Sequence, residues 1–188
     1  MEIPGFFYEE EFITKEEETQ LISLINENPW NESLVRRTQH YGYIYDYSSK
    51  KAAEETTPIP EWCHFLMDRL MEKQILKEIP DQLIINEYLP GQGIYPHIDH
   101  VHSFKDGIVS ISLNSDICME FIHNNDQDRK KTFPLKRRSL LCLHGESRYR
   151  WRHGIIARKF DYGKPRGKRI SLTFRKMNLP EHKRIRVE

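Results

Sequence analysis

Cysteine is scarce in this chain of 188 residues, and the few copies are not arranged as a framework. The three cysteines, Cys63, Cys118 and Cys142, are far apart in the sequence and form no C-x-x-C pair. This spacing argues against a disulfide scaffold and against a cysteine-rich zinc site, and it is typical of a protein in a reducing compartment.

The chain also lacks long apolar runs, internal repeats and an excess of charge of one sign. No stretch approaches eighteen apolar residues, and the start MEIPGFFYEEEF has neither a signal-peptide nor a transit-peptide pattern. We therefore expect a cytosolic or nuclear protein that does not enter a membrane. The 29 Lys and Arg residues balance 28 Asp and Glu residues, so binding of a polyanion would need a local basic patch.

The remaining pattern is that of one domain over residues 1–188, of α+β class and mainly β. In the first 80 residues, a capping box from Thr14 to Glu17 begins a helix that ends before Pro29, and a second helix is expected from about Glu61. Residues 81–178 read as short strands separated by turns, which predicts a sandwich or jelly roll. The predicted strands are 83–88, 107–113, 117–122, 139–143, 152–155 and 169–175, with polar loops at 50–60 and 124–131.

One pair of residues, His97 and Asp99, has the spacing of metal ligands. On a strand, side chains two residues apart lie on the same face, and His153 can join them from a distant strand. Two imidazoles and one carboxylate on one face of an octahedron are typical of non-haem Fe(II), with three positions left for a co-substrate and O₂. A zinc site that uses His100 and His102 is the alternative, although His100 is out of phase with the first two ligands.

A second motif, Arg169-x-Ser171-x-Thr173-x-Arg175, decides between these metals. Its polar side chains share one strand face, and Ile170, Leu172 and Phe174 share the other. An inward-facing arginine is costly unless it meets an anion, and its planar fork matches a carboxylate. A metal site beside a carboxylate receptor predicts a chelating dicarboxylate such as 2-oxoglutarate, with one end on iron and the other on arginine.

The segment from Val35 to Tyr47 interleaves basic and aromatic residues in near alternation. One interpretation is an edge strand that its charges keep soluble. The other is a nucleic-acid surface, on which phosphates meet Arg36 or Arg37 and bases stack on tyrosines such as Tyr41 and Tyr43. The residues alone allow both.

Together these motifs resemble those of the AlkB-type Fe(II)/2-oxoglutarate-dependent dioxygenases. The shared pattern is N-x-Y-x-P-G at residues 86–91, H-x-D at 97–99, His153 and R-x-S-x-T-x-R at 169–175. The resemblance implies a double-stranded β-helix core with supporting N-terminal helices, and iron on His97, Asp99 and His153. It also implies a 2-oxoglutarate site that contains Asn86, Tyr88, Arg169, Ser171 and Arg175.

Within this family, three phrases look most like the branch that hydroxylates modified wobble uridines in tRNA: LPGQGIYPHID, SLLCLHGESRYRWRHGI and SLTFRKM. The resemblance places a nucleotide-recognition lid within residues 1–80, which favours the nucleic-acid interpretation of Arg36, Arg37, Tyr41 and Tyr43. The implied partners are RNA, in particular tRNA, and a tRNA methyltransferase that acts in trans.

Three other functions share some of these features. A DNA or RNA repair demethylase and a protein hydroxylase would use the same core, and a metal-binding jelly roll without turnover would use the metal ligands alone. Repair members often carry an acidic residue where this chain has Val101, which weighs against direct reversal of base alkylation. The arginine strand weighs against the jelly roll without turnover, because such a module has no use for a co-substrate clamp.

Overall fold

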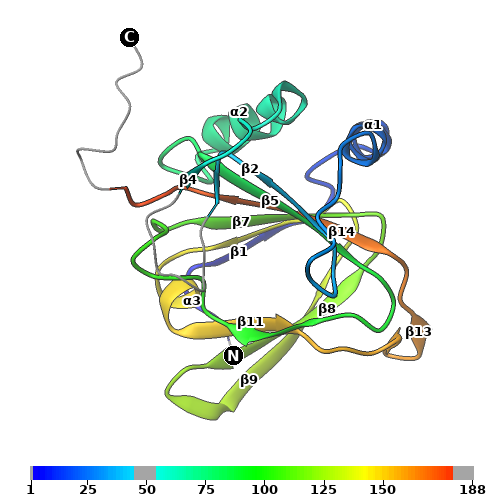
Figure 1. The fold of residues 1–188 in the computed structure, drawn as a ribbon. Coiled ribbons are helices and arrows are strands. Elements are labelled where there is room, and N and C mark those ends of the chain that lie inside the picture. Colours follow the sequence, from blue (N-terminus) through cyan, green and yellow to red (C-terminus); the bar gives the residue numbers. More distant parts are fainter. Residues whose placement is uncertain (1, 45–53, 180–188) are drawn as a thin grey trace.

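The structure is a computed structural model that describes residues 2–44 and 54–179, and it forms three layers (Figure 1). Helices α1 (Lys15–Asn26) and α2 (His64–Glu72) cover one face of a six-stranded sheet, and a four-stranded sheet faces the other side. In the part of the chain that the structure describes, no helix is long and apolar enough to span a membrane.

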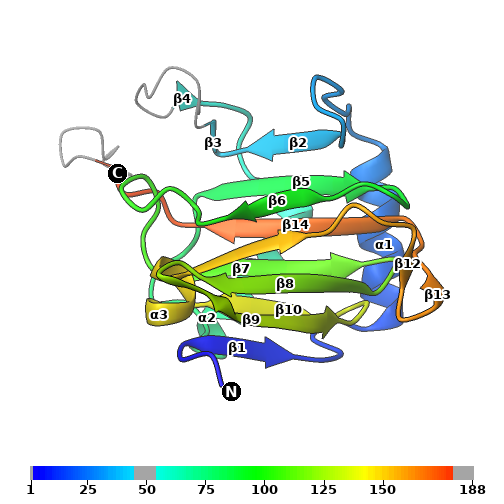
Figure 2. The same ribbon diagram turned by 90° about the horizontal axis from the view of Figure 1, so that it is seen from below.

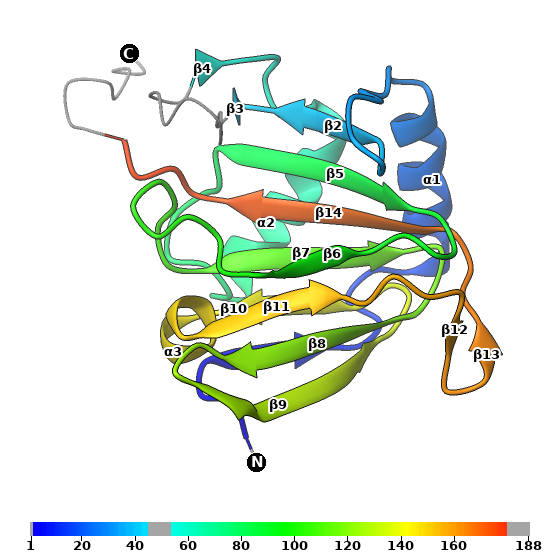
Figure 3. The ribbon, with the colours of Figure 1, turned by 60° about the horizontal axis from the view of Figure 1, so that its bottom comes forward.

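The larger sheet has the strand order β1-β10-β7-β14-β5-β2, and all its pairings are antiparallel (Figure 2). Its strands are β1 (Phe6–Glu9), β2 (Thr38–Tyr41), β5 (Gln82–Tyr88), β7 (Ile108–Leu113), β10 (Leu140–Leu143) and β14 (Arg169–Arg175). The smaller sheet has the order β6-β11-β8-β9, with β6 (Ile94–His97), β8 (Ile117–His123), β9 (Asp126–Leu135) and β11 (Trp151–Ile155). Between β5 and β8 each strand lies in the opposite sheet from the one before it, as in a double-stranded β-helix (Figure 3). The predicted jelly-roll core is confirmed.

Smaller elements complete the fold. Two hairpins pair β3 (Tyr43–Ile44) with β4 (Glu54–Glu55) and β12 (Phe160–Asp161) with β13 (Lys164–Pro165). A 3₁₀ turn, Glu61–Cys63, precedes α2, and the short helix α3 (Gly145–Tyr149) precedes β11.

The two faces of β14 have different surroundings, one apolar and one open to a cavity. Ile170, Leu172 and Phe174 are buried against the helices, with Leu21 and Ile25 of α1 packed into the same cluster. The alternate residues of β14 line a cavity between the sheets, and a second apolar cluster contains Trp151 and Phe121 of the smaller sheet. The period of two in the sequence therefore places the arginines inside the barrel, as predicted.

Both predicted helices are present. The Thr14 amide donates to the Glu17 carboxylate at 2.9 Å, and the Glu17 amide donates to the Thr14 hydroxyl at 3.1 Å, so the capping box is complete. Leu66 and Leu70 of α2 are fully buried, which confirms the apolar face expected after Glu61.

The predicted loop at residues 124–131 is wrong. Most of this segment belongs to β9, which pairs with β8 in the register Glu120↔Thr132. β9 is an edge strand of the smaller sheet with mostly exposed residues, so its polar composition follows from solvent contact on a strand rather than from a loop.

The first 80 residues do more than support the core, because β1 and β2 form the two edges of the larger sheet. The predicted loop at 50–60 includes β4, and its residues 50–53 lie outside the described part of the chain. Tyr45 and Tyr47 of the basic and aromatic segment lie outside it as well.

Candidate active site

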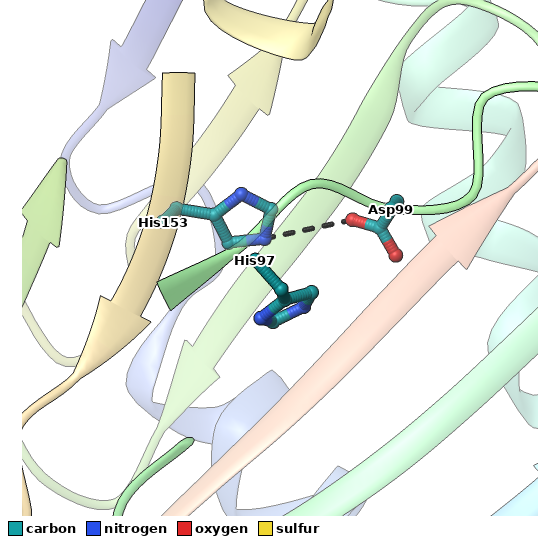
Figure 4. Close-up of side chains that lie close together, drawn as sticks. All are labelled: His97, Asp99 and His153. Carbon is teal, nitrogen blue, oxygen red and sulfur yellow. Dashed lines mark ion pairs between the residues drawn. The ribbon is translucent and has the colours of Figure 1, made fainter. Parts of the chain in front are cut away.

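Three predicted metal ligands converge between the two sheets (Figure 4). His97 ends β6, His153 lies directly opposite it on β11, and the centres of the two rings are 4.7 Å apart. The Asp99 carboxylate points toward the rings, with Oδ2 3.5 Å from Nε2 of His153. One donor atom from each of the three residues lies within 4.8 Å of the others.

The close approach of β6 and β11 depends on Gly154. A Cβ atom at this position would lie 2.7 Å from the Pro96 nitrogen and 2.8 Å from the Ile94 carbonyl oxygen, closer than real contacts allow. The missing side chain therefore lets β6 pack beside β11 and brings the two imidazoles together.

A backbone contact orients the His97 ring. Its Nδ1 lies 2.8 Å from the Tyr95 carbonyl oxygen, which can only accept a hydrogen bond. Nδ1 must then carry a proton, which leaves Nε2 as the ring nitrogen that can bind a metal.

Asp99 is held by two arginines that sequence reasoning did not connect with it. β6 ends at His97, so Asp99 lies in the following loop rather than on the strand that was predicted to carry it. Arg175 binds the second carboxylate oxygen of Asp99 at 2.6 Å. Arg148 of α3, which is 2% exposed, donates to the backbone carbonyls of Asp99 at 2.7 Å and of His100 at 3.3 Å.

Electrostatics keep the ligands in the protonation states that a metal requires. Burial opposes ionisation of Asp99, but the Arg175 guanidinium and the His153 imidazole outweigh it and hold the pKa of Asp99 well below its usual range. Burial lowers the pKa of His153 to about 4, against an opposing effect of the Asp99 carboxylate. At neutral pH Asp99 is therefore a carboxylate and His153 a neutral imidazole, and together with the imidazole of His97 these donors fit Fe(II).

The triad opens into a cavity of about 550 Å³ between the sheets, and the arginine strand lines it. Arg169 is 1% exposed, and it donates from Nε and Nη2 to the Ser112 hydroxyl at 3.3 and 2.9 Å. Among the described residues no carboxylate lies within ion-pair distance of Arg169, and burial lowers its pKa to about 10. A fully buried guanidinium that meets only a hydroxyl and the Tyr88 ring fits an incoming carboxylate.

The other predicted co-substrate residues line the same cavity. Asn86 and Tyr88 project from β5, beside β14, and Ser171 lies 2.9 Å from the Ser110 hydroxyl. Burial raises the pKa of Tyr88, so its phenol stays neutral and can donate a hydrogen bond. Arg175 faces the cavity too, but in this structure its guanidinium binds Asp99.

The basic and aromatic segment divides into two faces. Arg36, Thr38 and His40 line the cavity. Arg37 points elsewhere: it forms a two-pronged ion pair with Glu87, at 2.7 and 3.0 Å, and lies over the Trp30 ring.

The expectation that Tyr41 stacks on a base is corrected, because its ring is 6% exposed and buried in the cluster under the helices. Tyr43 packs against the cluster of Phe104, Ile108 and Met177 rather than lining the cavity.

His40 and Arg148 were missed as site residues. His40 lies two residues from Thr38 and four from Arg36, and this period could have placed it on the cavity face. Its pKa is lowered by burial and by the charges of Arg175 and Arg36. No local pattern marks Arg148, whose targets lie 48 and 49 positions away.

His100 and His102 lie outside the metal cluster. The His100 ring bonds to the Ser103 hydroxyl at 2.7 Å, and in the described ranges 2–44 and 54–179 the three-residue metal cluster contains neither histidine.

Arg148 provides a test of how the Asp99 loop is held. We expect Arg148→Lys to weaken metal binding by roughly 10-fold to 100-fold, because one ammonium cannot replace the fork that bridges two carbonyls. Titration of the metal-free protein with Mn(II), followed by calorimetry, measures the affinity. The matched control is Arg150→Lys, an exposed neighbour, which should bind Mn(II) like the wild type; equal losses in both variants would contradict the assignment.

The buried His153 predicts a pH dependence of the metal-free protein. Its folded-state pKa of about 4 lies below the value of about 6.5 in an unfolded chain, so the unfolded state takes up the proton first as the pH falls. Stability should therefore decrease by about 2 kcal/mol between pH 7 and pH 5 from this residue. Urea unfolding at both pH values measures it, and His153→Gln should show a correspondingly smaller decrease.

Comparisons with known proteins agree with this site. The profile of the 2OG-Fe(II) oxygenase superfamily matches residues 5–175. The chain is 40% identical over 168 residues to tRNA (carboxymethyluridine(34)-5-O)-methyltransferase ALKBH8 of Mus musculus, which covers 84% of this chain and 25% of that protein. It is 37% identical over 179 residues to the uncharacterized protein L905 of Acanthamoeba polyphaga mimivirus, covering 91% of this chain and 84% of that protein.

Solved structures share the fold. The structure of OsALKBH1 superposes with a TM-score of 0.70 at 18% identity, covering 94% of this chain and all of that one. The chain spans about a quarter of the length of the vertebrate ALKBH8 relatives, whose names describe the longer proteins. The matched profile, the relatives and the intact triad place the chain in the 2OG-Fe(II) oxygenase superfamily, as a member of its AlkB family of Fe(II)- and 2-oxoglutarate-dependent dioxygenases.

Proposed function

We propose that this dioxygenase hydroxylates a carbon atom of a modified wobble uridine in tRNA. The observation that supports this substrate is the similarity, 38–40% over about 84% of the chain, to vertebrate relatives named as tRNA carboxymethyluridine-34 methyltransferases. A tRNA methyltransferase that prepares or further modifies the same nucleotide in trans is part of the proposal.

Bound Fe(II) would supply the O₂ chemistry that couples conversion of 2-oxoglutarate to succinate and CO₂ with insertion of one oxygen atom into a C–H bond of the substrate. His97, Asp99 and His153 would hold the metal on one side and leave the cavity side open. Arg148 and Arg175 fix the Asp99 loop and carboxylate, so this ligand does not reorganise on binding.

The co-substrate site follows from the cavity wall. Arg169 would bind the distal carboxylate of 2-oxoglutarate, and the neutral phenol of Tyr88 and the amide of Asn86 would add donors beside it. Ser171 and Arg175 complete this wall. Apolar side chains also line the cavity, with Met119 and Ile155 on the smaller sheet and Leu143 on the larger one, and they would limit the access of water.

Incubation of the protein with Fe(II), 2-oxoglutarate and tRNA from cells that lack it tests the proposal. We expect succinate together with a hydroxylated wobble uridine, detected by mass spectrometry of the nucleosides, and neither product with the His97→Ala variant. Release of formaldehyde with loss of a methyl group would instead identify a demethylase. Turnover stimulated by a peptide and by no nucleic acid would contradict the proposal.

A further inference from the structure

The charged residues of the cavity leave one cation without a counter-charge. The charged residues that line the cavity are Arg36, Asp99, Arg169 and Arg175. Asp99 is bound by Arg175, and the proposed function places a 2-oxoglutarate carboxylate on Arg169. The remaining cation, Arg36, then has no anionic partner among the described residues.

Arg36 is fixed in the cavity rather than free in solvent. Its Nε donates to the Asn86 side-chain oxygen at 3.0 Å, and its guanidinium carbon lies 6.0 Å from the centre of the Tyr88 ring. Among the described residues, its two terminal nitrogens have no hydrogen-bond or ion-pair partner. These nitrogens keep four N–H donors in a planar fork, the geometry that binds an oxyanion.

The neighbouring Arg37 shows that the lack of a partner is particular to Arg36. Arg37 has the same side chain one position away, but Glu87 neutralises it through two hydrogen bonds. The sequence thus places one paired arginine outside the cavity and one unpaired arginine inside it.

The residues around Arg36 suit a nucleotide. Leu34 and Tyr95, which are 50% and 92% exposed, line the same cavity and present apolar surface. Thr38 and His40 add hydrogen-bonding groups on the β2 side. A base can contact the apolar groups while a charged group reaches the guanidinium.

We propose that Arg36 is the anion-binding residue of the substrate site, and that its terminal nitrogens bind one oxyanion of the substrate nucleotide. This inference rests on the proposed function for the nucleotide itself. The oxyanion is either a backbone phosphate or a carboxylate on the base substituent, because both offer two oxygens to the guanidinium fork.

Binding of synthetic anticodon stem-loops by fluorescence anisotropy tests the inference, with protein saturated with Mn(II) and N-oxalylglycine so that the co-substrate site stays filled. We compare the wild type with Arg36→Gln and with Arg37→Gln as the matched control. Arg36→Gln should weaken binding at least 10-fold, and if the anion is a backbone phosphate it should also reduce the slope of log K against log salt by about 0.7, as loss of one phosphate contact on single-stranded RNA predicts. Arg37→Gln should leave the slope unchanged, and Arg36→Lys should retain it. Circular dichroism melting checks that each variant is folded.

Two arms identify the source of the anion. If it is a carboxylate, the wild type binds an RNA with 5-carboxymethyluridine at the wobble position more tightly than the methyl ester, and Arg36→Gln loses this preference. If it is a phosphate, a methylphosphonate beside the wobble nucleotide weakens the wild type and leaves Arg36→Gln unaffected. Equal binding by Arg36→Gln and the wild type, or equal losses in both arginine variants, would overturn the inference.

If the protein binds none of these RNAs, the tRNA proposal is contradicted, and the inference about Arg36 needs a separate test. In that case, the binding of uridine 5′-monophosphate is compared with the binding of uridine. If the wild type binds the monophosphate more tightly and only Arg36→Gln loses this preference, the anion site is supported. If the wild type binds both equally, the inference is overturned.

Discussion

Replacement of His97 by alanine is expected to abolish turnover of 2-oxoglutarate, with a decrease of at least about 100-fold, because a ligand to the metal is lost. His97 is a better choice than Asp99. Asp99 is 3% exposed and binds Arg175, so its removal would leave a buried guanidinium without its partner and cost about 3–5 kcal/mol of stability. The His97 side chain is only half-buried and bonds to the Tyr95 carbonyl, so its loss disturbs little else.

The matched control for His97→Ala is His100→Ala. His100 lies three positions after His97, in the loop that follows β6, and its ring bonds to the Ser103 hydroxyl. We expect this variant to form succinate and to bind Mn(II) like the wild type. Full turnover in His97→Ala, or an equal loss in His100→Ala, would refute the assignment of the metal ligands.

The parts of the site that the sequence predicts are those that follow from strand periodicity. His153 and the alternation from Arg169 to Arg175 lie where a period of two places them, because these residues are on regular strands. The same period places Thr38 and His40 of β2 on the cavity side, and Arg36, two residues before β2 begins, lies on that side as well. His40 was missed because the direction of a single histidine side chain cannot be predicted before the strand that carries it is known.

Residues outside regular strands could not be predicted in this way. Asp99 was expected on a strand, but its position is set by Arg148 and Arg175, which approach from α3 and β14. Similarly, Tyr41 was expected at a binding surface, but the helices that bury its ring come from elsewhere in the chain. In each case the cause is a contact between segments distant in sequence, and no local pattern records it.

The other large effect is expected at Arg169. This side chain would bind 2-oxoglutarate, but in the metal-free protein it is a buried charge without an anionic partner among the described residues, which costs stability. We expect Arg169→Met to weaken binding of 2-oxoglutarate by about 100-fold, since a two-pronged, charge-assisted contact is lost. The same change should stabilise the metal-free protein by about 1–3 kcal/mol, because a buried guanidinium that meets only the Ser112 hydroxyl is replaced by an apolar side chain of similar length.

Calorimetric titration of the Mn(II)-loaded protein with 2-oxoglutarate, and urea unfolding of the metal-free protein, measure the two effects separately. Arg169→Lys is the control: it keeps the buried charge and loses the fork, so affinity should fall without a gain in stability. If Arg169 were a structural residue, its removal would lower both quantities together. A gain in stability combined with a loss of affinity therefore distinguishes an arginine held buried for a ligand from one that holds the barrel together.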